Sequence, residues 1–435
     1  MNHSLPWPLT VYRLGTSALT PFIGGLLAWR MRKGKEDRTR GGERRGYPGR
    51  ERPPGRLAWM HGASVGETIS LLPIVERLTR QGFTVLVTSG TVTSARMLAE
   101  RLPTRALHQF VPLDVMRFMR RFLDHWQPDL VLIAESEIWP NALAEIRRRE
   151  IPALLLNARM SERSFRRWQR VPKTASGVLR LFDLCLAQSE ADGERLERLG
   201  APRVVVAGNI KYDAPAPPAN PATVATLSAM IGERPVWLAA STHSGEEDLV
   251  LRAHRMLMRE HPGLLTIIVP RHPERGPEIA GIASAAGLAS SLRSLGDLPS
   301  RGDDVHIGDT IGELGLFYRL APLAFIGGSL VPRGGQNPIE PAKLGATIIH
   351  GPHVHNFTNV YQALDTPNGD GISGACPVSD SRTLAGAVHA LFEEPAHARA
   401  MARAAAQTTV SLGGAVDRTM QAITPYVMHM HLSGG

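Results

Sequence analysis

The chain has 435 residues, of which 43% are hydrophobic and 20% are charged. This composition provides enough apolar material for two folded cores and excludes a disordered, collagen-like or coiled-coil protein. The chain has 2 cysteines, Cys185 and Cys376, too few for a disulfide framework or a four-cysteine zinc site. A compact disulfide-rich secreted domain is therefore excluded as well.

The formal net charge is +9, which by itself suggests a nucleic-acid partner. However, residues 1–56 hold twelve basic side chains against four acidic ones, so nearly all of the excess charge lies there. We therefore expect no nucleic acid as a partner. The N-terminal segment alone is expected to meet an anionic surface.

This N-terminal segment has the pattern of a membrane anchor. Residues 5–29 are mostly apolar but are interrupted by Arg13 and by prolines, Trp7 and Trp29 flank them, and a basic cluster follows at 30–35. Interfacial tryptophans and basic flanks predict an anchor over residues 1–35 that binds anionic lipids and keeps the globular part cytoplasmic. A cleaved signal peptide is the alternative, but the charge follows the apolar stretch and no A-x-A site precedes it. Whether the segment spans or lies on the membrane stays open.

From Leu57 onward, short apolar runs alternate with helical patterns, as in βαβ units. A proline-rich stretch at 213–222 marks a linker, and the same alternation restarts after it. We therefore predict an α/β protein with two Rossmann-like, doubly wound domains that face a central cleft. The predicted boundaries are an anchor at 1–35, a first domain at 36–212, a linker at 213–234 and a second domain at 235–435. Strands are expected at 57–60, 84–90, 129–134, 153–156, 184–187, 203–207, 236–242, 264–273, 323–329 and 346–352.

The sharpest feature of the first half is HGASVGE at residues 61–67, between a predicted strand and a predicted helix. We favour Glu67 as a general base at the start of the helix, with the glycines admitting substrate to the backbone. A purely structural alternative is a capping box made by Ser64 and Glu67. A third alternative is a serine esterase, because Ser64 stands in a G-x-S-x-G pattern. That pattern requires an oxyanion loop earlier in the chain, and the basic segment before the strand at 57–60 contains no predicted strand to carry one.

In the second half, residues 241–247 again join a predicted strand to a helix, a place that suits an anion. A plain N-cap by Ser244 is the competing interpretation. Arg271 follows the next strand. The stretch from Gly327 to Pro341 combines a glycine-rich loop with an amide, Asn337, and a carboxylate, Glu340. Such a loop suits a ribose diol and a phosphate.

The sequence lacks the P-loop, G-x-G-x-x-G, H-E-x-x-H and Asp-x-Asp patterns. We therefore expect no metal and no cofactor in the reaction. The charge of a leaving group must then be met by Arg271, helix N-termini and backbone amides. This favours a donor whose leaving group is a monophosphate.

Several motifs together resemble the 3-deoxy-D-manno-octulosonic acid (Kdo) transferases of Gram-negative bacteria, which have the GT-B glycosyltransferase fold. They are the apolar anchor followed by KGKED at 33–37, HGASVGE at 61–67, ESEIWP at 135–140, NARMS at 157–161 with Arg163 and Ser164, GNIKYD at 208–213, STHSGEE at 241–247, PRHP at 270–273 and GGQNPIEP at 334–341. The resemblance runs over nearly the whole chain.

This resemblance implies an inverting transfer of Kdo from CMP-Kdo to the lipid A precursor (lipid IVA) at the cytoplasmic side of the inner membrane. Glu67 falls on the proton acceptor of the family. The implied CMP contacts are Pro270, Arg271, Gly312, Glu313, Leu314, Asn337, Pro338, Ile339 and Glu340. Further donor or acceptor contacts are expected at Ser64, Gly66, Glu137, Arg159, Lys211 and Ser241.

The sequence leaves some points open. Arg159 and the arginines at 163–170 suit lipid phosphates or the Kdo carboxylate, or else form a solvated basic face. The arginine- and glycine-rich stretch at 38–56 is expected to carry only surface charge. An inactive nucleotide-sugar-binding module remains an alternative to an enzyme, and the number of Kdo units transferred is not specified by the sequence.

Overall fold

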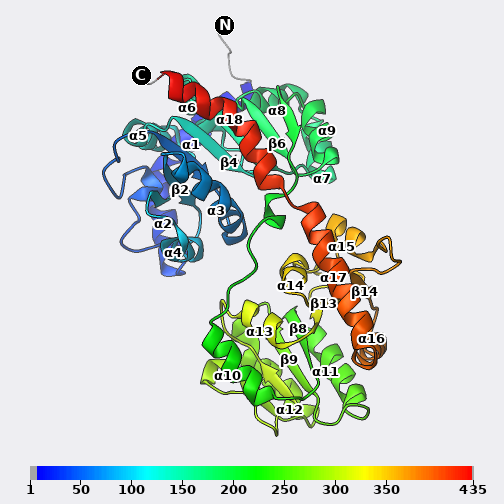
Figure 1. Cartoon of the computed structure of the whole chain (residues 1–435). Coiled ribbons are helices and arrows are strands. Elements are labelled where there is room, and N and C mark those ends of the chain that lie inside the picture. Colours follow the sequence, from blue (N-terminus) through cyan, green and yellow to red (C-terminus); the bar gives the residue numbers. More distant parts are fainter. Residues whose placement is uncertain (1–6, 434–435) are drawn as a thin grey trace. The chain divides into compact units, whose positions relative to one another are not determined.

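The computed structural model describes residues 7–433, and it divides into two compact units (Figure 1). The first unit comprises the chain up to Ala214 together with the residues from Leu412 onward, and the second unit comprises Pro215–Ser411. The second unit is thus inserted into the first. Each unit is built around its own seven-stranded sheet.

The sheet of the first unit is entirely parallel, in the order β3-β2-β1-β4-β5-β6-β7. The chain winds outward in one direction from β1 and then in the other from β4. The switch point between β1 and β4 is where ligands bind in folds of this kind. The strands are β1 Leu57–His61, β2 Thr84–Ser89, β3 Ala106–Phe110, β4 Leu130–Ala134, β5 Ala153–Ala158, β6 Leu184–Ala187 and β7 Val204–Val206.

Helices cover both faces of this sheet, which explains why its strands are apolar without alternation. In β1, Leu57 and Trp59 enter one hydrophobic cluster while Ala58 and Met60 enter another on the opposite face. The helices of the unit are α1 Trp7–Ala18, α2 Ile23–Arg32, α3 Val65–Arg80, α4 Val92–Arg101, α5 Met116–Trp126, α6 Pro140–Arg148, α7 Glu162–Trp168, α8 Pro172–Leu179, α9 Glu190–Arg198 and α18 Ala415–Ser433.

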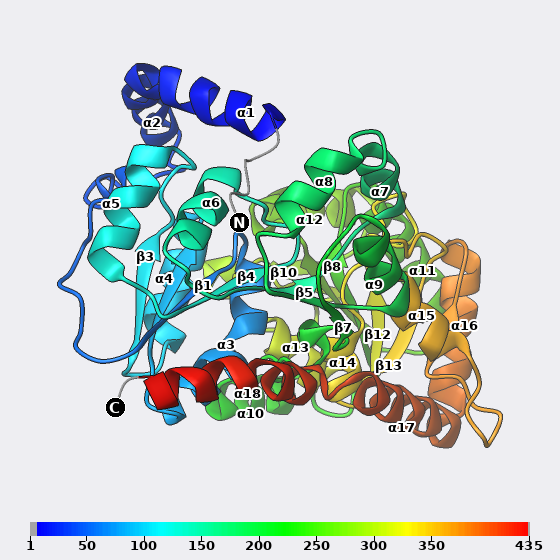
Figure 2. The same cartoon turned by 90° about the horizontal axis from the view of Figure 1, so that it is seen from above.

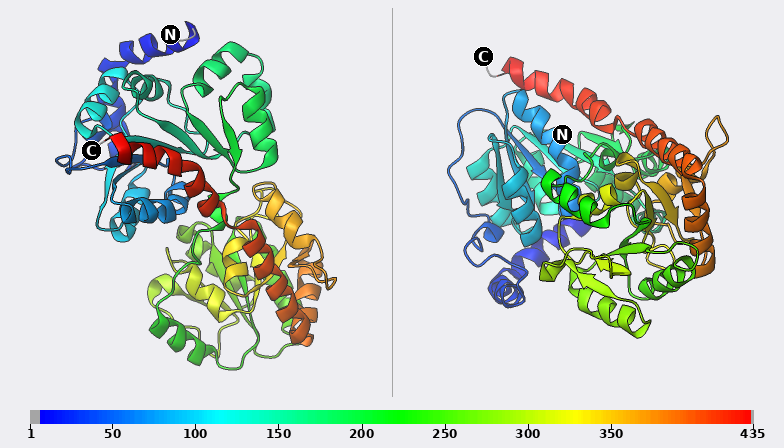
Figure 3. Two further views of the ribbon diagram at one scale, coloured as in Figure 1. Left: turned by 45° about the horizontal axis from the view of Figure 1, so that its top comes forward. Right: turned by 60° about the horizontal axis from the view of Figure 1, so that its bottom comes forward.

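Helix α18 departs from the predicted second domain at 235–435, because it packs on the first unit (Figure 3, red). Val416, Met420, Ile423 and Val427 follow helical spacing and join the cluster that contains Met60. The carboxylate of Asp213 accepts hydrogen bonds from the backbone N–H groups of Gly414 and Val416, at 2.7 and 2.6 Å. The C-terminal helix therefore completes the core of the first unit.

The sheet of the second unit has the order β10-β11-β9-β8-β12-β13-β14, again with parallel pairs, and its switch point lies between β8 and β12. Its strands are β8 Val236–Thr242, β9 Leu265–Pro270, β10 Ser290–Leu292, β11 Val305–Ile307, β12 Leu323–Ile326, β13 Thr347–His350 and β14 Ala375–Pro377. Its helices are α10 Pro221–Ile231, α11 Glu246–Leu257, α12 Gly276–Ala285, α13 Leu314–Leu320, α14 Ile339–Lys343, α15 Thr358–Asp365, α16 Ser381–Glu393 and α17 Pro395–Leu412.

Half of the predicted linker at 213–234 is helical, because residues 221–231 form helix α10. Asn220 caps this helix, and its Oδ1 accepts hydrogen bonds from the N–H groups of Ala222 and Thr223 at 2.9 and 3.4 Å. Leu227 and Ile231 are buried, and α10 packs against α13. The sequence does contain a strong helix start, with Asn220 as N-cap and Pro221 at the first helical position. The many prolines around it led to the prediction of a linker instead.

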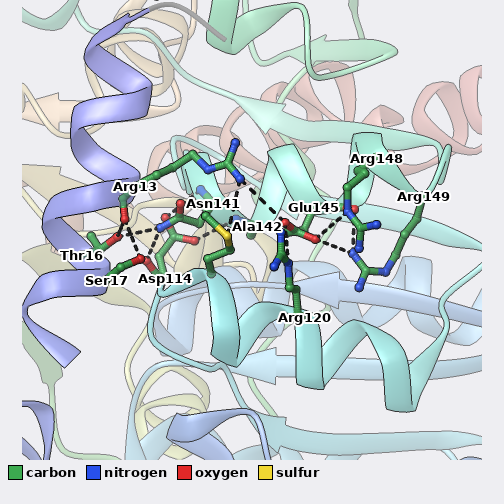
Figure 4. Close-up of polar contacts among 11 residues, drawn as sticks. Arg13, Thr16, Ser17, Asp114, Arg120, Asn141, Ala142, Glu145, Arg148 and Arg149 are labelled. Atoms are coloured by element: carbon green, nitrogen blue, oxygen red, sulfur yellow. Dashed lines mark hydrogen bonds and ion pairs between the residues drawn. The ribbon is translucent and has the colours of Figure 1, made fainter. Parts of the chain in front are cut away.

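The N-terminal helices α1 and α2 lie at the margin of the first unit, beside α5 (Figure 2). Within residues 7–433, no helix combines the length and the apolarity needed to cross a bilayer. The inner side of α1 is held by polar contacts to the α5–α6 region (Figure 4). Asn141 Nδ2 donates to Thr16 Oγ1 at 3.0 Å, and Arg13 lies 4.0 Å from the buried Glu145.

The arginine-rich stretch at 38–56 is not merely surface charge, which corrects the expectation from its composition. Arg44 is 4% exposed, pairs with the buried Glu36 at 2.9 Å, and donates to the carbonyl oxygen of Val111 at 3.0 Å. Glu43 is also buried and accepts a hydrogen bond from the N–H of Phe110 at 2.7 Å. These buried ions satisfy backbone groups next to the sheet edge at β3, so the stretch forms part of the fold.

Candidate functional site

The turn from β1 into α3 holds Glu67 by two hydrogen bonds. The N–H of Ala63 donates to Oε2 at 2.8 Å, and Ser64 Oγ donates to Oε1 at 2.7 Å. Ser64 also caps α3, accepting a 3.3 Å hydrogen bond from the N–H of Glu67. The capping interaction and a catalytic role are compatible, because an ionised carboxylate accepts about four hydrogen bonds and only two are used here.

The surroundings of Glu67 favour its protonated form. Burial raises the pKa of Glu67, and the nearby carboxylates of Glu135 and Glu137 raise it further, against the lowering effect of the Ser64 and Ala63 hydrogen bonds. A carboxylate with a raised pKa is a better proton acceptor at neutral pH than an ordinary glutamate. Glu67 therefore has the electrostatics of a general base.

Glu135 and Glu137 follow β4, the strand across the switch point from β1. Trp139 Nε1 donates to Glu137 Oε2 at 2.7 Å, which fixes this carboxylate 4.0 Å from Nε2 of His61. Burial lowers the pKa of His61 to about 4, so this imidazole is neutral at neutral pH. Lys211 forms an ion pair with Glu135.

The backbone is unusual where β4 and β5 end. Glu135 and Asn157 have φ values of 57° and 52°, a left-handed conformation that is uncommon for residues other than glycine. Asn157 Oδ1 accepts from the N–H of Ile210 at 3.1 Å, and Ser136 Oγ donates to the carbonyl oxygen of Arg159 at 2.7 Å. The ends of β4 and β5 and the segment after β7 are thus tied together at the carboxyl edge of the sheet.

The arrangement does not support the esterase alternative. In the G-x-S-x-G hydrolases, the serine nucleophile passes its proton to a histidine. Ser64 Oγ instead donates its proton to Glu67, and Nδ1 of the nearby buried His61 lies within hydrogen-bond distance of Thr88, 3.0 Å from its Oγ1. Ser64 therefore positions Glu67 and caps the helix.

In the second unit, the glycine-rich loop after β12 is held by Glu246, the first residue of α11. This carboxylate is fully buried and accepts hydrogen bonds from the N–H groups of Gly328, Ser329 and Leu330, at 2.6, 2.9 and 2.9 Å. It also accepts from the N–H of His243 at 2.9 Å. Glu246 thus joins the two loops of the switch point between β8 and β12.

The N-cap interpretation of Ser244 is wrong. Helix α11 has Gly245 as its N-cap, in a left-handed conformation with φ 92° and without a side-chain cap. The loops also approach closely, since a Cβ at Gly327 would lie 2.6 Å from the carbonyl oxygen of Ser241. Glycine is therefore required at 327 by this backbone contact.

Cationic groups gather around His243. Burial lowers the pKa of His243, and the nearby His272, Arg333 and Arg271 lower it further. Nε2 of His243 lies 3.0 Å from Nε2 of Gln336. Positive groups at a switch point make this a site for an anion such as a phosphate.

Glu340 and Asn337 lie beside this cationic group. Asn337 Nδ2 donates to Glu340 Oε1 at 3.2 Å. Burial raises the pKa of Glu340, while the Asn337 hydrogen bond and the charge of Arg271 oppose that rise. The effect of Arg271 on Glu340 places these two predicted contacts close together. Pro338 and Ile339 are buried next to them, at the start of α14.

The predicted contacts at Gly312, Glu313 and Leu314 precede or begin α13. The Glu313 carboxylate is engaged within the fold, since Arg293 donates to both of its oxygens at 3.0 and 2.9 Å and Thr310 donates at 2.6 Å. Gly312 is exposed with φ 87°. The charge of Glu340 acts on Tyr318 of α13, so α13 lies near the Glu340 loop.

Two arginine-lined grooves occur in the first unit. One, of about 570 Å³, lies over α7 and is lined by Glu162, Arg163, Arg166, Arg167 and Arg170. The other, of about 630 Å³, lies beside the N-terminal helices and includes Arg117, Arg120 and Arg121. In the first groove Arg166 is paired with Glu162 at 2.8 Å.

The sequence does not reveal the role of Glu246 or the pairing of Glu135 with Lys211. Both lie within motifs that were recognised, but their partners are 82–84 and 76 residues away, respectively. For Glu246, the sequence shows only two adjacent glutamates, Glu246 and Glu247, in the first turn of α11. Acidic residues are common there because they interact favourably with the helix dipole, so they do not indicate a loop contact.

The fold and both sites define a two-unit α/β protein with doubly wound sheets. Similar folds occur in a glycosyltransferase from Rickettsia africae (TM-score 0.59, 13% identity, 86% of this chain and 99% of that chain) and in a putative UDP-N-acetylglucosamine 2-epimerase from Listeria monocytogenes (TM-score 0.60, 14% identity, 86% and 98%). At these identities the likeness establishes the fold.

The family model of 3-deoxy-D-manno-octulosonic-acid transferases (kdotransferases) matches residues 39–214. The chain is 36% identical to the 3-deoxy-D-manno-octulosonic acid transferase of Bordetella pertussis, over 96% of this chain and 99% of that protein. It is 33% identical to the 3-deoxy-D-manno-octulosonic acid transferase of Haemophilus influenzae, over 90% of this chain and 92% of that protein. It is also 36% identical to a protein of Arabidopsis thaliana named as a probable mitochondrial 3-deoxy-D-manno-octulosonic acid transferase, over 88% of each chain. The chain belongs to the 3-deoxy-D-manno-octulosonic acid transferase family and is a glycosyltransferase.

Proposed function

We propose that this protein transfers Kdo from CMP-Kdo to the lipid A precursor with inversion, in lipopolysaccharide assembly. The observation that carries the proposal is the Glu67 carboxylate, held at the switch point of the first unit with a raised pKa. The relatives from Haemophilus influenzae and Bordetella pertussis, which are 33% and 36% identical to this chain, are named 3-deoxy-D-manno-octulosonic acid transferases.

In the proposed reaction, an acceptor hydroxyl oxygen attacks the anomeric carbon of Kdo while the bond from that carbon to the CMP phosphate oxygen breaks. Glu67 takes the hydroxyl proton, and the bonding electrons leave with the phosphate as CMP. A base is required because the alcohol is otherwise a weak nucleophile. The two bonds held by Ser64 and Ala63 fix the carboxylate while leaving lone pairs for the acceptor.

The donor nucleotide is proposed to bind at the switch point of the second unit. Arg271, together with the nearby His243 and Arg333, suits the charge that grows on the leaving phosphate. Asn337 and Glu340 suit the ribose hydroxyls. We propose Pro270, Pro338, Ile339 and the Gly312–Leu314 segment as the remaining walls of this pocket. No divalent cation takes part in the proposed step.

On the acceptor side, the arginine groove over α7 is proposed to receive a phosphate of the lipid A precursor. Arg163, Arg167 and Arg170 supply its positive charge. Arginine suits this role because its planar fork binds phosphate oxygens in pairs. Arg159, Glu137 and Lys211, at the ends of β4, β5 and β7, are proposed to border the sugar.

We further propose that α1 and α2 lie flat in the cytoplasmic interface of the inner membrane. Large apolar residues are exposed on this segment: Trp7 and Leu14 on α1 and Phe22 just before α2 are 76%, 67% and 73% exposed. Lys33 Nζ lies 4.3 Å from the Trp29 ring centroid, and Arg30 and Arg32 end α2. Apolar side chains beside basic ones suit an anionic lipid surface.

Mass spectrometry of products from CMP-Kdo and lipid IVA tests the transfer. We expect the acceptor to gain the mass of one or more Kdo units, and this mass also gives the number transferred. Absence of any product with wild-type protein, under conditions where a relative is active, would contradict the proposed function. An unchanged rate after EDTA treatment is expected for a reaction that uses no divalent cation.

Sedimentation with lipid vesicles tests the interfacial helices. We expect binding to vesicles that contain an anionic phospholipid and weaker binding to zwitterionic ones. The double variant Leu14→Ser, Phe22→Ser should lose most of this binding. Val410→Ser is the matched control, since Val410 is 79% exposed on α17 and lies outside the helix pair. Equal binding by both variants would exclude these helices as the contact.

A further inference from the structure

Three side chains with metal-ligating atoms meet in the second unit. His261 lies in the turn between α11 and β9, and His389 and Glu393 lie one helical turn apart on α16. Their candidate ligand atoms all lie within 4.8 Å of one another. His261 is 8% exposed, whereas the other two side chains reach the surface. An ion from solvent can therefore enter the cluster.

The two histidines already have nearly the geometry of a metal site. His261 Nε2 lies 3.0 Å from His389 Nδ1. The His261 ring packs edge-on against Phe392, with ring centroids 5.1 Å apart, which limits its rotation. Two nitrogen ligands at about 2.0–2.1 Å from a tetrahedral ion stand about 3.3 Å apart. The two nitrogens therefore need to move apart by only a few tenths of an ångström for an ion to take the place of the hydrogen bond between them.

Glu393 completes the set from the same helix as His389. Residues four apart lie on the same face of a helix, so its carboxylate can turn toward the two imidazoles. We propose that His261, His389 and Glu393 bind one divalent transition-metal ion, of which Zn²⁺ is the best match, with water at the remaining position. Two imidazoles and one carboxylate favour Zn²⁺ over Mg²⁺ or Ca²⁺, which prefer sites made of oxygen ligands.

The site is separate from the proposed nucleotide pocket. His261 precedes β9, whereas Arg271 follows it, so the two lie toward opposite ends of that strand. The ion would join α16 to a segment 128 residues earlier in the chain. Because the unfolded chain does not hold these ligands together, binding stabilises the folded second unit. The role is structural and independent of sugar transfer.

The test uses the full chain without a polyhistidine tag, stripped with EDTA and then dialysed free of it. Zn²⁺ competition against the indicator 4-(2-pyridylazo)resorcinol should show one site that His389→Ala removes. Saturating Zn²⁺ should raise the Tm of the wild-type protein by about 5 °C. Co²⁺ should give the visible absorption of a tetrahedral nitrogen and oxygen site.

His397→Ala is the matched control, because His397 is an exposed histidine on α17 outside the cluster. It should leave the zinc stoichiometry and the Tm shift unchanged. His261→Gln serves as a second ligand variant and should also lose the site. Equal zinc binding by wild type, His389→Ala and His261→Gln, or no Tm shift in the wild type, would overturn the proposal. Sugar transfer can succeed or fail without affecting this result.

Discussion

Ser64 Oγ donates a 2.7 Å hydrogen bond to Glu67 Oε1, and both residues belong to the same helix start. The second oxygen of Glu67 is held by the N–H of Ala63 at 2.8 Å. The carboxylate is therefore fixed before any substrate arrives, and this preorganisation reduces the entropy lost on reaching the transition state.

Replacing Glu67 tests the proposed base. Glu67→Gln keeps an oxygen that can accept the hydrogen bond from Ala63, but it removes the proton acceptor. We expect the turnover number to fall by on the order of a hundredfold or more, with little change in CMP-Kdo binding. Steady-state kinetics and a nucleotide titration measure the two effects. Wild-type turnover in the folded variant would refute the assignment.

Ser64→Ala separates positioning from nucleophilic catalysis. If Ser64 only orients Glu67 and caps α3, this variant should keep measurable turnover and lose about 1 kcal/mol of stability. Denaturant unfolding measures the stability change. Loss of labelling by an organophosphate, together with complete loss of activity, would instead favour an esterase.

The acid side of the pH–rate profile should report Glu67. Because burial and two neighbouring carboxylates raise its pKa above the usual 4.5, activity should fall at a higher pH than for an ordinary glutamate base. Glu137→Gln removes one of these carboxylates, so the Glu67 pKa should drop and the loss of activity should move to lower pH. Glu76→Gln, at an exposed position of α3, is the control and should leave the profile unchanged. A shift to higher pH in Glu137→Gln would contradict this electrostatic account.

Arg271→Ala should weaken CMP-Kdo binding while leaving the fold intact, because Arg271 is exposed and its charge acts on Glu340. We expect the dissociation constant to rise roughly tenfold or more, as for loss of one charge-assisted hydrogen bond. Calorimetric titration with CMP measures it. Arg319→Ala, an exposed arginine on α13, is the control, and an unchanged titration for Arg271→Ala would remove this residue from the pocket.

The stability of the second unit should decrease in acid through His306. Its Nδ1 contacts Ser291 Oγ at 2.9 Å, and among the described residues its buried Nε2 has no hydrogen-bond partner. Burial lowers the pKa of His306 from 6.5 to about 4. Its contribution to stability is therefore complete above pH 6.5 and is lost as the pH falls toward 4, at about 1.4 kcal/mol per pH unit. Unfolding measured across this range should show a smaller slope for His306→Gln, and an unchanged slope would exclude His306 as the cause.

The sequence predicts the strands that form continuous hydrophobic runs, because this pattern can be recognised without knowing which segments pair with them. The apolar strands β1, β4, β8 and β9 were identified because both of their faces are buried, so their residues form unbroken hydrophobic runs. Strands β3, β10, β11 and β14 are not predicted. Strand β3 is only partly buried, and β10, β11 and β14 each have three residues with polar or proline positions and depend on a neighbour for pairing. Tertiary contacts decide such segments.

The same distinction applies to the candidate sites. The contact of Glu67 with Ser64 could be predicted, because the two residues lie three positions apart at the start of one helix. The hydrogen bonds of Glu246 to the loop after β12 could not, because they span more than 80 residues. The burial of Arg44 cannot be predicted either, because nothing in a run of arginines indicates which one is buried.

The return of α18 to the first unit determines how this enzyme can be divided into fragments. A fragment that stops before Leu412 lacks Val416, Met420, Ile423 and Val427, and it would leave part of an apolar core uncovered. Such a truncated chain should aggregate, even though it retains every strand of both sheets. Residues 215–411, by contrast, form a contiguous piece suited to expression by itself, whereas the first unit needs its two pieces rejoined by a short artificial loop.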